Sequence, residues 1–468
     1  MAQLESTMFR EYDLRGRVNE RELNPNTVAI ISRAYATMLH RRKITDAVVG
    51  YDLRSGSKEL AESATEALLA SGINVIALGR ILSPIMYAAQ YHYHTKGGMM
   101  LTASHNPNGW MGFKLASGFS CTFGPAEMKE LQELTVSEKF VKGPGKLRQE
   151  DYIPIYAQDV VRRVKLKRPI KVLVNAGNGT TGPIAPPILR QAGCEVFEFL
   201  TEPDLEFKHY FPNPSQEKMM HDTGTNAVKF HADLGLAFDG DGDRLGVTDE
   251  CGQVVWPDRY LILLSREILK ATPGASIVFD AKCSRALSDD IQRHGGKPVM
   301  WKTGHSYIKE KLHAIKAPLA GEMSGHIFFG PPVYYGFDDA IFTALKLAEL
   351  LSQNDQPFSK LVADTPNYFS TPTLQAQCAD ELKYNVVAEI AKAFKKEGCD
   401  VIMFDNDPRY GGRVEFPDGW GLLRASSNLP VLVMRCEATT ERRLAEITDL
   451  FKQKLKSYPQ VGDKWESG

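Results

Sequence analysis

Segments that read as strands alternate with segments that read as helices along most of the chain, and this alternation constrains the fold most strongly. The pattern begins near residue 26, restarts near residue 150 and restarts again after residue 256. Alternating strands and amphipathic helices are typical of parallel sheets covered by helices. The pattern therefore predicts three similar α/β domains with mixed, mostly parallel sheets.

The predicted elements of these three domains are short and regularly spaced. Helices are expected at residues 26–42, 58–70, 152–164, 183–192, 216–231 and 338–351. Strands are expected at residues 47–52, 73–78, 97–102, 170–175, 195–200, 234–238, 276–280, 298–301 and 318–321.

The last hundred residues follow a different pattern. They contain an expected helix, a strand, a hairpin, a further strand and a final helix, at residues 381–396, 401–404, 413–424, 431–437 and 441–457. This order predicts a smaller C-terminal α+β domain. The resulting division into domains is 1–150, 151–255, 256–367 and 368–468.

Composition excludes several function classes. The chain has 468 residues, 43% hydrophobic and 24% charged, with a formal net charge of −1. This balance gives no electrostatic case for a nucleic-acid partner. No apolar run is long enough for a membrane span, and the first residues lack the pattern of a signal peptide. The seven cysteines form no CxxC pair, which favours free thiols in a reducing cytoplasm.

One serine occupies a position suited to chemistry. Ser104 follows the expected strand 97–102 and precedes a turn of His105, Asn106 and Pro107. A hydroxyl at the carboxyl end of a strand is well placed to project into a cleft. For an isolated Ser-His-Asn-Pro turn, however, a local cap or a solvated turn is the more common interpretation.

Three carboxylates follow the expected strand 234–238. Asp239, Asp241 and Asp243 alternate with glycines, which permit a sharply bent backbone around one hard cation. A calcium loop of the EF-hand kind is excluded, because its sixth position requires Gly and is Arg244 here. A plain acidic turn remains an alternative, but a Mg²⁺ site is the preferred interpretation.

A glycine-rich turn suggests a competing function. Gly177, Gly179 and Gly182 form G-x-G-x-x-G between a strand and a helix, with Glu195 and Glu198 downstream. This spacing is typical of a dinucleotide-binding oxidoreductase. It explains neither the serine turn nor the aspartates, so a tight turn onto a helix is the preferred interpretation.

Two further loops carry polar side chains. Glu322 and Ser324 follow the strand 318–321 and are expected on the same side of an extended chain, where they suit hydrogen bonds to sugar hydroxyls. Arg424 precedes the polar residues Ser426, Ser427 and Asn428, a combination suited to a phosphate dianion.

These four stretches occur in this order, one in each predicted domain. Together they resemble the α-D-phosphohexomutase superfamily, in particular its bacterial and archaeal phosphomannomutase/phosphoglucomutase branch. The resemblance covers nearly the whole chain, from residues 9–16 to residues 424–437. It implies four domains around a central cleft. It also implies reversible transfer of phosphate between the 1- and 6-positions of hexose phosphates, through a phosphoserine and a hexose 1,6-bisphosphate.

The resemblance also assigns roles to individual residues. Ser104 would carry the phosphate, and one Mg²⁺ would be held by Ser104, Asp239, Asp241 and Asp243. Arg244 would stabilise the transferring phosphoryl group, while Lys114 and His105 would handle protons and charge. The remaining matches are Tyr12 and Arg15 in the first domain, Lys282, His305, Glu322 and Ser324 around the sugar, and Arg424, Ser426, Ser427 and Asn428 on the non-reacting phosphate.

The sequence departs from the family pattern at two places. Met111 stands where the family usually has Asn, and Ser427-Asn428 follow Ser426 where the family usually has Arg-x-Ser-Asn-Thr. The residues Gly-Glu-Met-Ser-Gly at 321–325 are typical of enzymes that use both glucose and mannose phosphates, whereas Gln at 323 is typical of phosphoglucosamine mutases.

Three alternatives stay open from the sequence. They are a phosphoglucosamine mutase, an oxidoreductase and a catalytically idle phosphosugar-binding protein. Either a monomer or a homodimer is compatible with the sequence.

Overall fold

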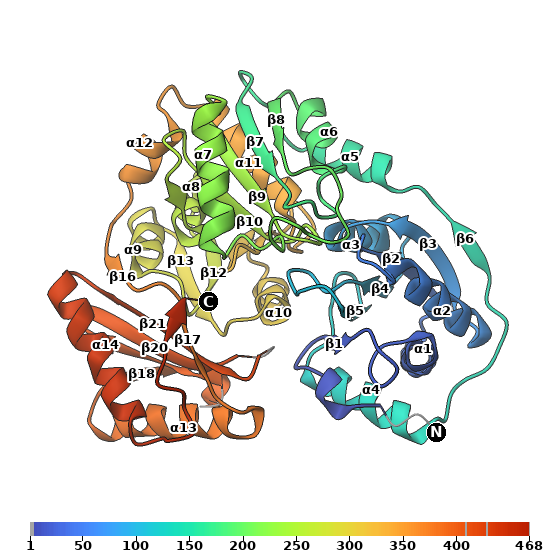
Figure 1. Ribbon diagram of the computed structural model, residues 1–468. Helices are drawn as coiled ribbons and strands as arrows, with labels where there is room; N and C mark the ends of the chain where they lie inside the picture. The colour runs from blue at the N-terminus through green and yellow to red at the C-terminus, as the bar shows by residue number, and fades with distance from the viewer. Residues whose placement is uncertain (1–3, 408–409, 427–428, 468) are drawn as a thin grey trace. The chain divides into compact units, whose positions relative to one another are not determined.

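The computed structural model describes residues 4–407, 410–426 and 429–467 (Figure 1). The chain forms two compact units, and each is described by itself. Unit 1 contains residues up to 257 together with 324–361, and unit 2 contains residues 258–323 together with those from 362 onward.

The first sheet of unit 1 has the strand order β1-β5-β4-β2-β3-β6. Its strands are β1 (Leu14–Arg17), β2 (Asp46–Tyr51), β3 (Asn74–Arg80), β4 (Gly97–Leu101), β5 (Trp110–Ser117) and β6 (Leu147–Gln149). Strands β2, β3, β4 and β6 pair in parallel, whereas β5 pairs antiparallel with β4 and β1. The accompanying helices are α1 (Pro25–Arg41), α2 (Ser57–Ala70), α3 (Ser83–His92) and α4 (Pro125–Ser137).

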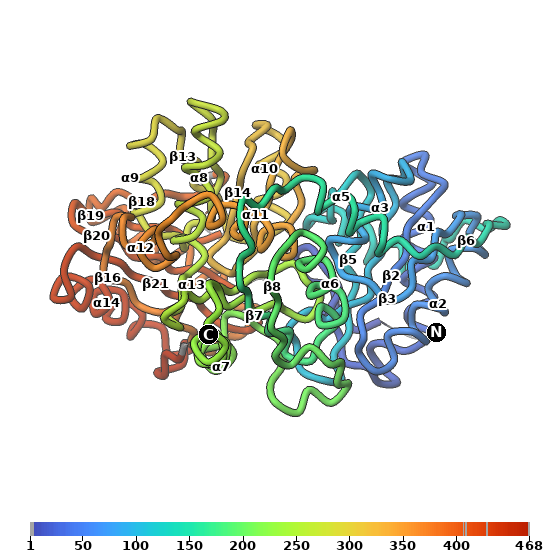
Figure 2. Tube along the Cα trace, turned by 90° about the horizontal axis from the view of Figure 1, so that it is seen from above, coloured from blue at the N-terminus to red at the C-terminus, as the bar shows by residue number. Residues whose placement is uncertain are grey.

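The start of α1 illustrates how local sequence sets an element boundary. The Asn24 side chain accepts hydrogen bonds from the backbone N–H groups of Asn26 and Thr27, and Thr27 Oγ1 accepts one from Asn24 N. Pro25, which has no N–H to satisfy, occupies the first helical position. Helix α2 then lies beside β2 and β3 in both views (Figures 1 and 2).

Alternation along β5 directs one charged side chain away from the main core. Phe113 and Leu115 belong to the hydrophobic cluster built with α1, α2 and α4. Successive side chains of a strand point to opposite faces of a sheet, so Lys114 points to the other face. Lys114 is nevertheless 3% exposed, which means that its charge must be compensated inside the protein.

The second sheet of unit 1 has the strand order β11-β10-β9-β7-β8. Its strands are β7 (Lys171–Asn175), β8 (Glu195–Phe199), β9 (Leu234–Phe238), β10 (Leu245–Thr248) and β11 (Val254–Val255). Strand β7 pairs in parallel with β8 and β9, and β10 returns antiparallel to β9. Unit 1 also contains α5 (Ile153–Val161), α6 (Ala185–Gln191), α7 (Glu217–Lys229), β15 (Ile327–Phe329) and α11 (Ala340–Ser352). Helix α12 (Phe358–Ala363) follows where the chain passes into unit 2.

Unit 2 begins with a parallel α/β arrangement. Strand β12 pairs in parallel with both β13 and β14. The elements are α8 (Pro257–Ala271), β12 (Ser276–Asp280), α9 (Arg285–Arg293), β13 (Lys297–Trp301), α10 (His305–Ile315) and β14 (Leu319–Gly321).

The C-terminal part of unit 2 is an antiparallel sheet with two long helices. Its strand order is β18-β19-β20-β21-β17-β22, with β16 also paired to β21. The elements are β16 (Phe369–Ser370), β17 (Leu374–Gln377), α13 (Asp380–Lys396), β18 (Asp400–Met403), β19 (Gly412–Phe416), β20 (Gly419–Ala425), β21 (Val431–Ala438), α14 (Glu441–Leu455) and β22 (Glu466–Ser467). Helices α13 and α14 pack their apolar faces onto this sheet.

The architecture confirms the predicted fold class, with mixed, mostly parallel α/β sheets and a C-terminal α+β domain. The sequence did not predict the antiparallel strands β1 and β5. The expected helix 338–351 begins at Ala340, because Asp339 caps it by accepting a hydrogen bond from Phe342 N. Among the described residues no helix is long and apolar enough to cross a bilayer, and the seven cysteines are free thiols.

Candidate active site

Ser104 lies in a strained turn directly after β4, as the sequence predicted for its position. Its φ is +48° and it is 2% exposed. A non-glycine residue with positive φ costs free energy and persists only where neighbours hold it. Here the N–H of Ser104 donates to Thr102 Oγ1 at 2.9 Å, and Arg54 Nη2 donates to the Ser104 carbonyl at 2.7 Å.

The Ser104 hydroxyl reaches the aspartate loop. Its Oγ donates to Asp239 Oδ2 at 2.7 Å and lies 3.1 Å from His105 Nδ1. Burial lowers the pKa of His105 well below its ordinary value, and the nearby Arg244 and Arg15 lower it further. His105 therefore stays neutral at pH 7, and its Nδ1 is available to exchange a hydrogen bond with the hydroxyl.

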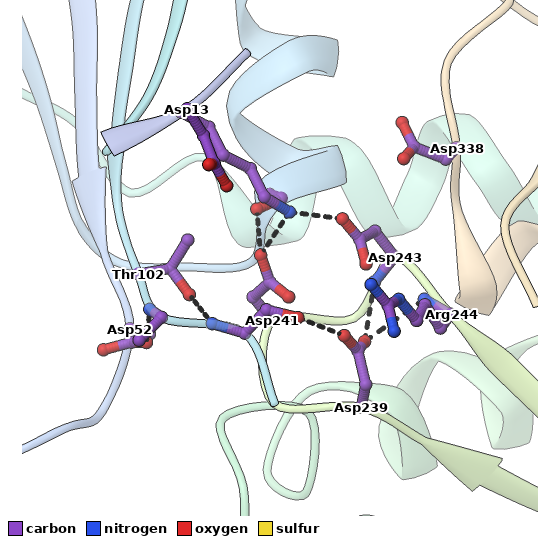
Figure 3. Close-up of polar contacts among 12 residues, drawn as sticks. Asp13, Asp52, Thr102, Asp239, Asp241, Asp243, Arg244 and Asp338 are labelled. Carbon is purple, nitrogen blue, oxygen red and sulfur yellow. Dashed lines mark hydrogen bonds and ion pairs between the residues drawn. The ribbon is translucent and has the colours of Figure 1, made fainter. Parts of the chain in front are cut away.

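The three aspartates occupy the tight connection between the antiparallel strands β9 and β10, as shown in Figure 3. Asp239, Asp241 and Asp243 are all at most 1% exposed. Gly242 has a φ of +74°, which glycine adopts without strain. Asp239 Oδ1 accepts hydrogen bonds from the N–H groups of Asp243 and Arg244, both at 3.1 Å. These contacts bend the loop around its own carboxylates.

Lys114 supplies positive charge to this loop. Its Nζ donates to Asp241 Oδ2 at 2.6 Å and also to Asp243 Oδ2. Burial alone would lower the pKa of Lys114, but Asp241 and Asp243 raise it well above its ordinary value. Burial would likewise raise the pKa of Asp241, but Lys114, Ser83 and Arg15 together bring it below the ordinary range. The pKa of Asp239 is instead raised, by burial and by the two neighbouring aspartates.

The aspartate loop has the donor set that a hard divalent cation requires. One carboxylate oxygen from each of Asp239, Asp241 and Asp243 lies within 4.8 Å of the others. Asp241 Oδ1 and Asp243 Oδ1 are buried and have no hydrogen-bond partner. Buried carboxylate oxygens without a donor are costly unless a cation binds them. Oxygen ligands of this kind fit Mg²⁺, so the residues present are compatible with the expected ion.

Arg15 and Tyr12 lie at the start of the first sheet. Arg15 in β1 pairs with Gly112 in β5, and its Nε donates to Asp13 Oδ2 at 2.8 Å. Arg15 Nη1 is buried without a hydrogen-bond partner, and Asp241 and Asp243 are close enough to act on its charge. This donor is available to an anion at the aspartate loop. Tyr12 is 6% exposed, two residues before β1.

A histidine that the sequence did not single out orients Arg244. Arg244 Nε donates to His326 Nε2 at 2.9 Å, and His326 Nδ1 lies 2.9 Å from Asp338 Oδ2. Arginine can only donate, so His326 Nε2 is the acceptor and the ring proton lies on Nδ1, facing Asp338. The chain of contacts from Asp338 to Arg244 fixes the direction of the guanidinium. His326 lies in the predicted sugar loop, but Asp338 had no sequence signal.

In unit 2, Asp280 at the end of β12 organises the predicted sugar-binding residues. Its carboxylate accepts hydrogen bonds from Thr303 Oγ1 at 2.7 Å and from Met323 N at 3.0 Å, and it lies 3.8 Å from Lys282 Nζ. Burial lowers the pKa of Lys282 although Asp280 opposes this effect. Lys282 is therefore a weakly solvated cation available to an anionic ligand.

Glu322 and His305 are also brought together in unit 2. Glu322 Oε1 accepts a hydrogen bond from Gly304 N at 2.6 Å, and His305 follows as the first residue of α10. Both side chains are at most 6% exposed. The chain turns at Met323 and Ser324 instead of remaining extended, so the expected common side of a strand is not formed there. The turn follows from Met323 N, which donates to Asp280.

The predicted phosphate loop follows β20. Arg424 is the next-to-last residue of β20, and Ser426 comes directly after the strand. Ser427 and Asn428 lie outside the described residues. Lys383 of α13, which the sequence did not predict, donates to Ser426 O, to Leu429 O at 3.0 Å and to Asp380 Oδ1 at 2.6 Å.

The departure at Met111 has a structural account. Met111 is fully buried in β5, and its sulfur lies 3.8 Å from Ser57 Oγ. The same Ser57 hydroxyl donates to Asp52 Oδ1 at 2.6 Å. Met111 therefore packs beside residues that support the serine turn.

Models of one protein family match almost the whole length of the chain. Family models described as phosphoglucomutase/phosphomannomutase alpha/beta/alpha domains I, II and III match residues 6–142, 150–252 and 256–369. The model of the C-terminal domain of the same family matches residues 374–454.

Individual relatives extend over almost the full length. The chain is 39% identical to a phosphomannomutase/phosphoglucomutase of Pseudomonas syringae, over 97% of this chain and 96% of the relative. It is 37% identical to a phosphoglucomutase of Neisseria gonorrhoeae, over 98% and 99% of the two chains. A crystal structure of a phosphoglucomutase/phosphomannomutase family protein from Burkholderia thailandensis has a TM-score of 0.89 and 36% identity, covering 97% of this chain and 98% of that one.

Proposed function

Because the chain belongs to the phosphoglucomutase/phosphomannomutase family, we propose that it moves phosphate between the 1- and 6-positions of glucose and mannose phosphates. The chain is therefore an enzyme of the phosphohexomutase type. In this proposal Ser104 carries a phosphoryl group, gives it to the free hydroxyl of a hexose monophosphate and recovers the other phosphate from a hexose 1,6-bisphosphate. Hexose 1- and 6-phosphates are its substrates.

The proposal gives each residue near Ser104 a task. Phosphoryl transfer depends on positioning and on compensation of charge at the equatorial oxygens. Arg244 would donate to those oxygens, held in direction by His326. Lys114 would compensate the aspartates, and Arg15 Nη1 would donate to the phosphate. His105, which is neutral and 3.1 Å from the Ser104 hydroxyl, would hold or pass its proton.

Asp239, Asp241 and Asp243 would hold one Mg²⁺ together with the phosphate on Ser104. The ion would supply positive charge at the phosphoryl oxygens. The two buried carboxylate oxygens without hydrogen-bond partners support this assignment.

Residues of the predicted sugar and phosphate loops would bind the rest of the sugar phosphate. Glu322 and Ser324 would accept and donate hydrogen bonds to sugar hydroxyls, and His305 and Lys282 would lie near the substrate. The non-reacting phosphate would be held by Arg424, Ser426, Ser427 and Asn428. The names of the relatives favour glucose and mannose over the alternative, glucosamine. The same proposal divides the chain into domains 1–150, 151–255, 256–367 and 368–468.

The proposal also places the enzyme in the cytoplasm, where a reducing medium would keep its free cysteines as thiols.

One observation carries the proposal. A serine held at φ +48° places its hydroxyl 2.7 Å from a buried aspartate of a three-carboxylate loop. Strain and burial alone do not distinguish this turn, because Ser120 is also buried at a φ of +48°. The contact of the Ser104 hydroxyl with the aspartate loop is what supports the proposal.

The test combines mass spectrometry with kinetics. Wild type, Ser104→Ala and Ser120→Ala are purified, and their intact masses are compared. Ser120 is the matched control, because it is also buried and also has a φ of +48°. We expect one phosphate on wild type and Ser120→Ala and none on Ser104→Ala. A coupled assay with glucose, mannose and glucosamine 1-phosphates should show turnover only in the phosphorylated proteins and rank the three sugars. Full turnover by Ser104→Ala would overturn the proposal.

A further inference from the structure

The glycine-rich turn at residues 177–182 has no role in the proposed chemistry, yet it is entirely buried. Its glycines are covered by the protein's own atoms. A Cβ at Gly177 would lie 2.9 Å from Pro212, one at Gly179 would lie 3.2 Å from the same proline, and one at Gly182 would lie 1.9 Å from the Thr201 carbonyl. A pyrophosphate therefore has no open approach to this turn, which removes the basis of the oxidoreductase alternative.

The topology explains why this turn lies beside the aspartate loop. Strands β7 and β9 are parallel neighbours, with Asn175 paired to Ala237. Segments that follow the carboxyl ends of adjacent parallel strands meet at the same edge of the sheet. The turn after β7 and the aspartates after β9 are therefore in contact. A Cβ added to Gly179 would lie 3.5 Å from the Cα of Gly240.

Two threonines of the turn reach in different directions. Thr181 Oγ1 donates to the backbone carbonyl of Asp239 at 3.0 Å. Thr180 Oγ1 accepts a hydrogen bond from Leu53 N at 3.0 Å. Both threonines are at most 1% exposed. One turn of the second sheet thus bonds to the aspartate loop on one side and to the end of β2 in the first sheet on the other.

Leu53 lies between the two residues that shape the serine turn. Asp52 Oδ2 accepts a hydrogen bond from Ala103 N at 3.3 Å. Arg54 donates to the carbonyls of Ser104 at 2.7 Å and Pro107 at 3.1 Å. The peptide that Thr180 holds is therefore flanked on both sides by residues that hold the serine turn.

The turn at residues 177–182 also connects to Arg54 through Phe207. Asn178 Nδ2 donates to Glu202 O at 2.6 Å, which holds the start of the segment that continues to Phe207. The Phe207 ring lies 5.4 Å from the Arg54 guanidinium. The turn at 177–182 is thus connected to the serine turn by the Thr180 bond and by this packing.

We propose that Thr180 and Thr181 are positioning residues that hold the serine turn and the aspartate loop in register, a pair called here the threonine clamp. The inference rests on the proposed function, since it concerns how Ser104 and Asp239 are aligned for phosphoryl transfer. The two groups come from different sheets and must meet within hydrogen-bond distance. A shift of about 1 Å in such a geometry costs roughly a hundredfold in rate.

The test uses substitutions that preserve volume. Thr181→Val and Thr180→Val remove one hydroxyl each, and Thr181→Ser restores the hydroxyl at position 181. Thr135→Val in α4 is the matched control, because Thr135 is also buried and its hydroxyl donates within its own helix, to Gln132 O. For each variant we measure kcat and KM with glucose 1-phosphate, thermal stability, and Mn²⁺ binding from the electron paramagnetic resonance signal of the free ion.

The clamp predicts a fall in kcat of roughly ten- to a hundredfold for both valine variants, with KM changed by less than about threefold. Thr181→Val should also bind Mn²⁺ several-fold more weakly, because the Asp239 backbone loses its fixed position. Thr181→Ser should recover most of both properties, and Thr135→Val should resemble wild type.

Two results would overturn the clamp. One is a wild-type kcat and Mn²⁺ affinity in Thr181→Val. The other is a loss that follows the fall in thermal stability and is not recovered by Thr181→Ser. Absence of turnover in wild type would count against the proposed function instead, and the Mn²⁺ titrations would still decide whether Thr181 positions Asp239.

Discussion

Lys114 Nζ donates to Asp241 Oδ2 across 2.6 Å, although the two residues belong to different sheets and lie 127 positions apart in the chain. Lys114 lies in β5 between two core residues and points to the opposite face of the sheet, and Asp241 is the middle aspartate of its loop. The contact joins the two sheets electrostatically at the place where the metal ion is expected.

Replacement of Lys114 should make the protein depend on metal for stability. Lys114→Met leaves Asp241 and Asp243 buried without their cation, and loss of one partner from a buried ion pair costs about 3–5 kcal/mol. A divalent ion can replace part of the missing charge. We therefore expect millimolar Mg²⁺ to raise the melting temperature of Lys114→Met more than that of wild type, measured by differential scanning fluorimetry.

Lys218→Met is the control, because the ion pair of Lys218 with Asp222 is exposed and such pairs contribute little. An equal effect of Mg²⁺ on all three proteins would contradict the prediction.

Removal of His326 should reduce the rate more than substrate binding. His326→Phe deprives Arg244 Nε of its acceptor, so the guanidinium loses its fixed direction. If Arg244 acts mainly on the transferring phosphoryl group, kcat should fall roughly ten- to a hundredfold with little change in KM. Asp338→Asn should have a smaller effect in the same direction, since it weakens only the contact behind the histidine. The exposed His313 provides a control substitution, and a rise in KM alone would refute the assignment.

Lys383 should affect binding of the non-reacting phosphate. Lys383 is 2% exposed, and all three of its described acceptors lie at the ends of the predicted phosphate loop or at the start of α13. Lys383→Met should raise KM for hexose phosphates roughly tenfold, because Ser426 and Leu429 would lose the side chain that binds both of their carbonyls. The change in kcat should be small. Lys454→Met, which removes an ion pair with Glu397 elsewhere in the same domain, should leave KM unchanged.

Asp339 should make unit 1 less stable as the pH rises, whereas most carboxylates have the opposite effect. Burial raises its pKa to about 6 from the ordinary 3.8, against the hydrogen bonds from Phe342 N, Tyr156 and Tyr334. The folded state therefore binds this proton more tightly than the unfolded state does. The contribution of Asp339 to stability falls as pH rises from about 4 to about 6, by up to roughly 3 kcal/mol, and stays at its low value above that range.

Asp339→Asn lacks this ionisation. Its melting temperature minus that of wild type should therefore become more positive between pH 4 and pH 7. Asp222→Asn, which changes a partly exposed carboxylate, should show no such trend. A difference that is constant over this pH range would mean that Asp339 is not the titrating group.

The fold could be predicted largely from the alternation of elements, and the exceptions have a physical reason. Strands β2, β7 and β9 were predicted because they are apolar runs between turn residues. Strand β5 was missed because it is buried on both faces and contains Gly112 and Lys114, so neither alternation nor a continuous apolar run marks it.

The residues with reactive side chains could also be predicted from the sequence, because phosphoryl chemistry requires recognisable residue types in short motifs. As the resemblance implied, unit 1 brings these residues together: Ser104, Asp239, Asp241, Asp243, Lys114 and Arg244. Their functional roles remain a proposal.

The sequence analysis did not predict the residues that support them, since each acts through a contact between distant segments. Arg54 acts on Ser104, Thr181 on Asp239 and Asp338 on His326, at separations of 50, 58 and 12 positions. Arg54 and Thr181 had a signal that could have been used. Each follows a strand that is the parallel neighbour of the strand before its target, so it lies at the same edge of the sheet as that target.

At Gly240 the aspartate loop touches the serine turn so closely that an added Cβ would lie 2.3 Å from the Ser104 carbonyl. A single methyl group there would separate the Ser104 turn from the aspartate loop while leaving the cores of both sheets unchanged. The residues proposed to bind the sugar and the non-reacting phosphate would also remain intact. Under the proposed function, we expect Gly240→Ala to retain binding of hexose phosphates and to lose their conversion. In a cell, such a protein would act as a sink for the substrate of its intact counterparts.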